Sequence, residues 1–281
     1  MMGNLAVAKL ISNWFDKNAG RALGIAAVGI SFSGVVLPLI VDPLLDIVGW
    51  RNVYVIFASV VLFIILPLIF FVVIDDPYTV NQVKDGMKRD LEEESLPKVM
   101  TSKNLLSKKV FWIISLAFAF QFLSMMGVIA FLPIHASKMG LDQTWNLIGF
   151  PVKQYVFAYA LAAFGGVLGK LIFGYLIDIM KAAYPSMLAM SLQATGIFGF
   201  TYFSEPSIFL LSALIFGLGY GAATPLMTAC YLRAFGSNNL GKARGISSPI
   251  VAPLQPIGIL ITSIFIGFQD TYFVAFNIMG C

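Results

Sequence analysis

Apolar stretches of about 20 residues recur along this chain and limit what it can fold into. A helix needs about 20 apolar residues to cross the roughly 30 Å hydrocarbon core of a bilayer. The chain is 59% hydrophobic and 11% charged, whereas a soluble domain carries about 25% charged residues. A large soluble core would need polar helix faces, and a membrane barrel would need alternating strands, which these stretches lack. We therefore predict an all-α membrane protein with spans at approximately 22–45, 51–74, 110–133, 155–180, 184–203, 207–232 and 246–268.

The remaining segments divide the chain into three parts. Residues 1–12 and 271–281 are apolar but too short to cross a bilayer. The longest polar stretch, 75–109, has mixed charge and no apolar periodicity, which is typical of a solvated linker, with a partner-binding segment as the alternative. The predicted parts are residues 1–74, the linker 75–109 and residues 110–281.

Lysine and arginine are unevenly distributed among the loops, and such a bias marks the cytoplasmic side of a membrane protein. Loops 13–21, 75–109, 181–183 and 233–245, together with Lys9, hold 14 of the 18 basic residues. Three more lie in the loops of the opposite side, and one lies within a span. We predict a multi-pass protein of the plasma (inner) membrane with those four loops in the cytoplasm. The net charge of +4 belongs to these loops and does not indicate nucleic-acid binding.

A short pattern occurs twice, at the cytoplasmic start of two spans. It reads G-R-A-L-G-I at residues 20–25 and G-K-A-R-G-I at residues 241–246, an offset of 221 positions. Two copies in the same orientation indicate a parallel internal repeat, as in duplicated transporters. The offset places the counterpart of span 207–232 at about −14 to 11. We therefore expect residues 1–12 to be the tail of a longer span and the chain to be a fragment.

Three stretches resemble the major facilitator superfamily. The sequence W-F-D-K-N-A-G-R-A-L-G-I from Trp14, followed by Pro38 and G-W-R, is similar to its fourth loop and fifth span, most closely in the monocarboxylate and oxalate/formate branch. The run G-K-L-I-F-G-Y-L-I-D, Gly169 to Asp178, resembles the eighth span, and F-G-L-G-Y-G-A-A-T-P, Phe216 to Pro225, resembles the tenth. The resemblance implies a major facilitator fold of two six-helix halves. Spans 4–6 would precede the linker and spans 7–11 with the start of 12 would follow it, so spans 1–3 and most of span 12 would be missing.

Lys170 is the first candidate substrate contact. A lysine near the middle of a span costs about 2.5–3.5 kcal/mol on insertion scales, so it usually faces a cavity or a partner. No acid lies deep in a complete span, and a transported carboxylate would complete the ion pair. The resemblance implies a carboxylate-binding basic residue at this position, usually an arginine, whereas lysine lacks the bidentate fork. The alternatives are that Lys170 snorkels or pairs with a residue in the missing spans.

Four polar residues within spans are further candidate substrate contacts, each of which could instead form a hydrogen bond between helices. Span 246–268 is expected to bend toward a cavity because three prolines, at positions 249, 253 and 256, interrupt its hydrogen-bond ladder. The four residues are Gln121, Tyr220, Thr224 and Gln255.

Asp178, at the cytoplasmic end of its span, is the candidate conformational gate. The resemblance implies that this aspartate stabilises a closed state by facing the N-terminus of a span in the other half. That N-terminus would lie near Gly20–Gly24, where free backbone N–H groups favour a negative charge. A water-solvated interfacial acid is the alternative. The other gate candidates are Arg21, Gly24 and Lys242.

Catalytic and metal-binding patterns are absent from the sequence. It contains no nucleophile elbow, phosphate loop or paired carboxylates, and its two cysteines and one histidine show no metal spacing. We place His135 at the membrane interface and expect no cofactor and no enzymatic activity. The predicted function is secondary transport of small organic anions, monocarboxylate-like, by alternating access with proton or anion-exchange coupling. The alternatives are a non-transporting sensor or scaffold, a degenerate truncated transporter, and a membrane enzyme or channel.

Overall fold

The computed structural model describes residues 2–74, 77–80, 82, 85, 100–141, 143–147, 150–203, 205–269 and 272–280. Most of the predicted linker 75–109 lies outside these residues. The described part is almost entirely helical, which confirms the predicted all-α fold class. Five of its helical segments are long and apolar enough to cross a membrane: Ile47–Val72, Lys109–Ile129, Gln154–Ile179, Pro206–Phe235 and Ser237–Ile266.

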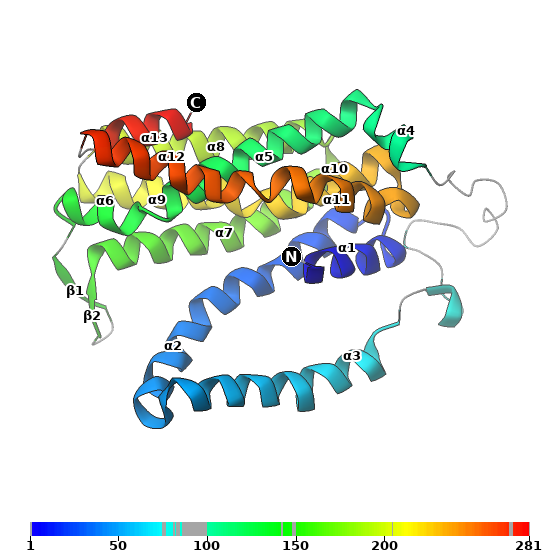
Figure 1. Cartoon of the computed structure of the whole chain (residues 1–281), viewed down its shortest axis with the longest axis horizontal. Coiled ribbons are helices and arrows are strands. Elements are labelled where there is room, and N and C mark those ends of the chain that lie inside the picture. The colour runs from blue at the N-terminus through cyan, green and yellow to red at the C-terminus, as the bar shows by residue number, and fades with distance from the viewer. Residues whose placement is uncertain are drawn as a thin grey trace.

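The N-terminal part forms a long hairpin beside the main bundle (Figure 1). Helix α1 (Met2–Trp14) is followed by α2 (Ala19–Val60), which turns back at Gly49, whose φ is 74°. Only glycine adopts such a φ readily. A π-helical turn η1 (Val61–Ile65) and helix α3 (Leu66–Val72) complete the second arm. No described residue in the most apolar window of Ile47–Val72 is buried, as expected for a segment that faces lipid.

The main bundle in Figure 1 consists of the helices that follow the linker. A 3₁₀ turn η2 (Pro77–Val80) and helix α4 (Ser102–Leu106), capped by the Thr101 hydroxyl, precede it. The bundle helices are α5 (Lys109–Ile129), α6 (Leu132–Lys138), α7 (Gln154–Ile179), α8 (Ala183–Tyr202), α9 (Pro206–Gly221), α10 (Ala223–Phe235), α11 (Ser237–Val251), α12 (Leu254–Gln269) and α13 (Tyr272–Gly280).

Several predicted boundaries differ from those of the structure. The expected span 207–232 is divided at Ala222 into α9 and α10. The expected loop 233–245 is wrong, because α11 begins at Ser237, directly after Gly236 with a φ of 76°. The proline-rich span breaks between α11 and α12, as the prolines predicted. An antiparallel hairpin, β1 (Thr144–Leu147) with β2 (Phe150–Lys153), lies in the connection before α7 and was not predicted.

Aromatic side chains fill the interior of the bundle in two clusters. One includes Phe111, Phe118 and Tyr231 from α5 and α10, and the other includes Phe200 and Phe216 from α8 and α9. The rings of Phe200 and Phe216 lie 5.7 Å apart in an edge-to-face arrangement. Because lipid is as apolar as these side chains, close packing rather than exclusion from water holds such helices together.

Candidate functional site

Helices α2 and α7 cross with their backbones in contact, and glycines make this crossing possible. A Cβ added to Gly24 would lie 2.4 Å from the carbonyl oxygen of Lys170, and one added to Gly174 would lie 2.7 Å from the carbonyl oxygen of Gly20. A side chain at either position would collide with backbone atoms. Gly174 therefore allows α2 to approach α7 closely.

The Asp178 carboxylate lies at the N-terminus of α2, beside this crossing. It accepts hydrogen bonds from the backbone N–H groups of Gly20 (2.7 Å) and Arg21 (2.9 Å). These are two of the N–H groups that a helix leaves without an internal partner, and the helix dipole favours a negative charge there. Hydrogen bonds to a charged group are worth about 1.5–3 kcal/mol each, so these two bonds form a strong polar link between the described parts of α2 and α7.

The Arg21 side chain adds a weaker interaction to the same carboxylate. Its Nε lies 3.8 Å from Asp178 Oδ2, but the arginine side chain is 45% exposed whereas that of Asp178 is 6% exposed. Water screens such a pair, which is worth about 0–1 kcal/mol. The guanidinium also lies 4.4 Å from the centre of the Tyr175 ring. Its position is therefore fixed by the ring as well as by the carboxylate.

Lys170 lies two turns before Asp178 on α7, on the side that faces α2. It is 6% exposed, and its carbonyl is the group against which Gly24 packs. The hydroxyl of Tyr220, on α9, lies against Gly166, one turn before Lys170. The structure therefore places Lys170 and Tyr220 on packed helices at neighbouring levels.

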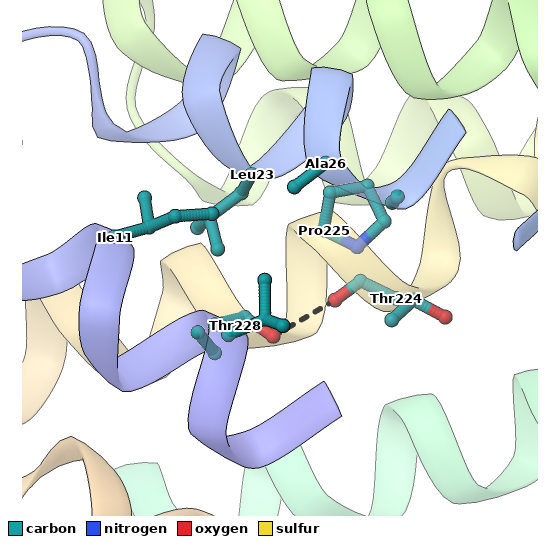
Figure 2. A pocket seen from close by; sticks show the side chains of 9 residues that line it. Ile11, Leu23, Ala26, Thr224, Pro225 and Thr228 are labelled. Atoms are coloured by element: carbon teal, nitrogen blue, oxygen red, sulfur yellow. Dashed lines mark hydrogen bonds between the residues drawn. The ribbon is translucent and has the colours of Figure 1, made fainter. Parts of the chain in front are cut away.

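A cavity of about 120 Å³ lies between α1, α2 and α10 (Figure 2). Its walls are mostly apolar, and the two threonines Thr224 and Thr228 supply the polar groups, with the Thr228 hydroxyl donating to the Thr224 carbonyl (3.0 Å). Among the candidate substrate contacts, Thr224 lines this cavity. The other lining residues are Val7, Ala8, Ile11, Leu23, Ala26, Ala27 and Pro225.

Gln121 and Gln255 lie elsewhere in the bundle. The Gln121 amide donates to the Gly219 carbonyl (3.4 Å), and Gln193, which the sequence analysis did not select, donates to the Gln121 carbonyl (3.1 Å). Both glutamines are buried between α5, α8 and α9. Gln255 begins α12, and its N–H donates to the Ala252 carbonyl (3.4 Å). None of the contacts found among the described residues joins either Gln121 or Gln255 to Lys170.

The second copy of the repeat has different surroundings. The Lys242 ammonium donates to the carbonyl of Met100, at the end of the linker (2.7 Å), and so lies away from Asp178. A Cβ added to Gly241 or Gly245 would meet no atom within 4 Å. The structure thus brings together three of the four gate candidates and places Lys242 in another contact. Both copies lie in the first turns of helices, so the predicted loop 233–245 is corrected, whereas the predicted loop 13–21 is shortened to residues 15–18 between α1 and α2.

His135, which was predicted to lie at the membrane interface, is buried within the bundle. It is 4% exposed, its Nε2–H donates to the Phe200 carbonyl (2.8 Å), and its ring lies 4.8 Å from that of Phe276. Burial lowers the pKa of His135, and the bond to Phe200 opposes this effect. In the described part of the chain no three metal-binding side chains come together.

Comparison with known proteins identifies the family. A search of curated proteins found no match to the chain. A family model described as Major Facilitator Superfamily matches residues 2–254. That range covers both copies of the repeat, the α2–α7 crossing and the cavity. The chain therefore belongs to the major facilitator superfamily and is a multi-pass membrane protein of the secondary transporter class.

Proposed function

We propose that this protein moves small organic anions, monocarboxylate-like, across the membrane by alternating access, with proton or anion-exchange coupling. The observation that carries the substrate class is Lys170, a lysine buried within a candidate membrane span. A charge at that depth is costly unless it faces a cavity or a counter-charge, and intramembrane cations commonly mark a substrate pathway. A carboxylate in transit would supply the counter-charge during the cycle.

The gate is part of the same proposal. Alternating access requires that one contact between the two halves form on the cytoplasmic side and break again. The hydrogen bonds between Asp178 and the N-terminus of α2 suit that role because they join segments on opposite sides of the linker. They lie two turns from Lys170, so that opening the crossing would uncover the lysine.

Uptake into proteoliposomes tests the substrate class. We expect a panel of labelled mono- and dicarboxylates to compete for uptake, Lys170→Ala to abolish it, and Lys170→Arg to retain it because the positive charge remains. Lys181→Ala is the matched control, since this lysine lies just beyond α7 and is exposed. Unimpaired uptake by Lys170→Ala, or uptake of cations rather than anions, would overturn the proposal.

A further inference from the structure

Asp85, from the linker, holds the turn that precedes α2. Its carboxylate accepts hydrogen bonds from three consecutive backbone N–H groups, those of Asp16, Lys17 (3.1 Å) and Asn18 (3.0 Å). It also accepts one from the Asn18 side-chain amide (2.9 Å), and the Asp85 N–H donates to the Trp14 carbonyl (3.1 Å). Consecutive N–H groups that converge on one anion form a backbone nest, and here the anion belongs to the same chain.

The two carboxylates bind adjacent stretches of one short segment. Asp85 takes the N–H groups of residues 16–18, and Asp178 takes those of residues 20 and 21. The Asn18 N–H points to Asp85, and the Asn18 carbonyl accepts from the Ala22 N–H (3.1 Å) as the first bond of α2. The bonds to Asp85 therefore help to set the direction of the Gly20 and Arg21 N–H groups, which bind Asp178.

The far end of the linker makes a comparable contact with the second copy of the repeat. The Met100 N–H donates to the Asn239 side chain (2.7 Å), and the Met100 carbonyl accepts from Lys242 (2.7 Å). The described parts of the linker thus bind near both copies of the G-[RK]-A-x-G-I pattern. Asp85 and Met100 are therefore the described points at which the linker contacts the segments that begin α2 and α11.

We propose that Asp85 is a positioning residue of the cytoplasmic gate, which presents the Gly20 and Arg21 N–H groups to Asp178 and couples the gate to the central linker. The inference rests on the proposed function only in taking the Asp178 contact to be a gate. Loss of the Asp85 carboxylate releases residues 16–18, and the N–H groups that Asp178 needs lose their orientation. The gate then opens more often.

Cysteine accessibility measures the gate without the need for a substrate. The reporter is Ala27→Cys, a buried residue (7% exposed) on the wall of the cavity in Figure 2, in a background in which Cys230 and Cys281 are replaced by serine. Inside-out vesicles that contain the protein are treated with a membrane-impermeant maleimide. We expect a reaction at least about tenfold faster in Asp85→Asn and in Asp178→Asn, the factor that corresponds to the loss of one charge-assisted hydrogen bond.

A double variant and controls separate positioning from general damage. Because Asp85 acts through Asp178, the variant with both substitutions should react no faster than Asp178→Asn alone. Asp85→Glu should restore much of the slow rate. Trp14→Phe, which removes the bond from the Trp14 Nε1–H to the Ile74 carbonyl (2.8 Å), should leave the rate nearly unchanged. That bond joins the end of α1 to Ile74, just before the linker, without touching the N–H groups bound by Asp85.

The outcomes distinguish the two levels of the proposal. If Asp178→Asn speeds labelling and Asp85→Asn does not, the positioning role of Asp85 is wrong and the gate stands. If the effects of the two substitutions multiply, the two carboxylates act independently and the inference fails. If neither substitution changes labelling, the gate itself is wrong.

Discussion

Replacing Gly24 by alanine tests whether backbone contact holds α2 against α7. The added Cβ would lie 2.4 Å from the Lys170 carbonyl oxygen, and a backbone atom of α7 has little freedom to move away. Over-packing of this kind costs about 1–3 kcal/mol, and contact with rigid backbone favours the upper part of that range. Against this, alanine in place of glycine inside a helix gains about 0.5–1 kcal/mol.

Gly245 provides a matched control because it holds the corresponding position in the second copy of the repeat. A Cβ there meets no atom within 4 Å, so Gly245→Ala should gain the helix propensity term alone and raise the melting temperature. The difference between the two variants cancels the propensity term and isolates the contact. At about 2–3 kcal/mol it corresponds to a difference in Tm of about 4–12 °C.

Thermal unfolding in detergent, followed by light scattering and tryptophan fluorescence, measures this difference. Gly24→Ala should melt below the wild type and Gly245→Ala at or above it. The Ala27→Cys reporter should also label faster in Gly24→Ala, because the crossing can no longer close. Equal shifts of Tm for the two alanine variants would refute the close contact of α2 with α7.

Three further results are expected from the same melting assay. Lowering the pH from 7.5 to 5 should lower the Tm of the wild type more than that of His135→Gln. Burial lowers the pKa of His135 below its ordinary value of about 6.5, so the unfolded chain binds the proton before the folded protein does and the folded state loses stability as the pH falls. An equal loss of Tm in both proteins would contradict this. Tyr231→Phe should lower the free energy of unfolding by about 1 kcal/mol, because the Tyr231 hydroxyl forms a buried 2.6 Å hydrogen bond with Ser115. An unchanged Tm would argue against that bond. Gly236→Ala should lower the free energy of unfolding by about 1–3 kcal/mol, since a φ of 76° and a ψ of 167° are readily adopted by glycine alone. A stabilised variant would show that residue 236 does not have this backbone conformation.

Much of the fold could be predicted from the sequence, because in a bilayer the length of an apolar run fixes the length of a helix. The segments 110–133 and 155–180 fall on α5 and α7, and the proline-rich segment breaks where its prolines stand. The break between α9 and α10 at Ala222 and the early start of α11 were not predicted. Hydropathy reports burial in lipid and carries little information on local backbone geometry. The hairpin β1–β2 was missed for a similar reason, since residues 144–153 lie in a connection between two spans and resemble any loop.

The contact of Asp178 with the N-terminus of α2 could be predicted in outline, because the resemblance to the major facilitator superfamily implied it. Gly20 and Gly24 are four apart and so lie on one face of a helix, and Asp178 stands at the end of its span, where a carboxylate can reach another helix terminus. Asp85 could not be selected, because one acid in a polar linker resembles its neighbours until the fold brings it to residues 16–18. Lys242 was predicted to be a gate residue together with Asp178. Its hydrogen-bond partner is instead Met100, which reaches Lys242 because of the path that the linker takes in the fold.

The distance between the N-terminus of α2 and the C-terminus of α7 tests the central claim most directly. Lys17 and Lys181 are both exposed and flank the Asp178 contact, so spin labels at these positions report whether the contact is closed or open. In lipid nanodiscs we expect a short and a long distance in exchange, with Asp178→Asn shifting the population toward the long one and Glu205→Gln, at the opposite end of α8, leaving it unchanged. A single short distance that neither Asp178→Asn nor an added carboxylate alters would contradict a gate at this crossing.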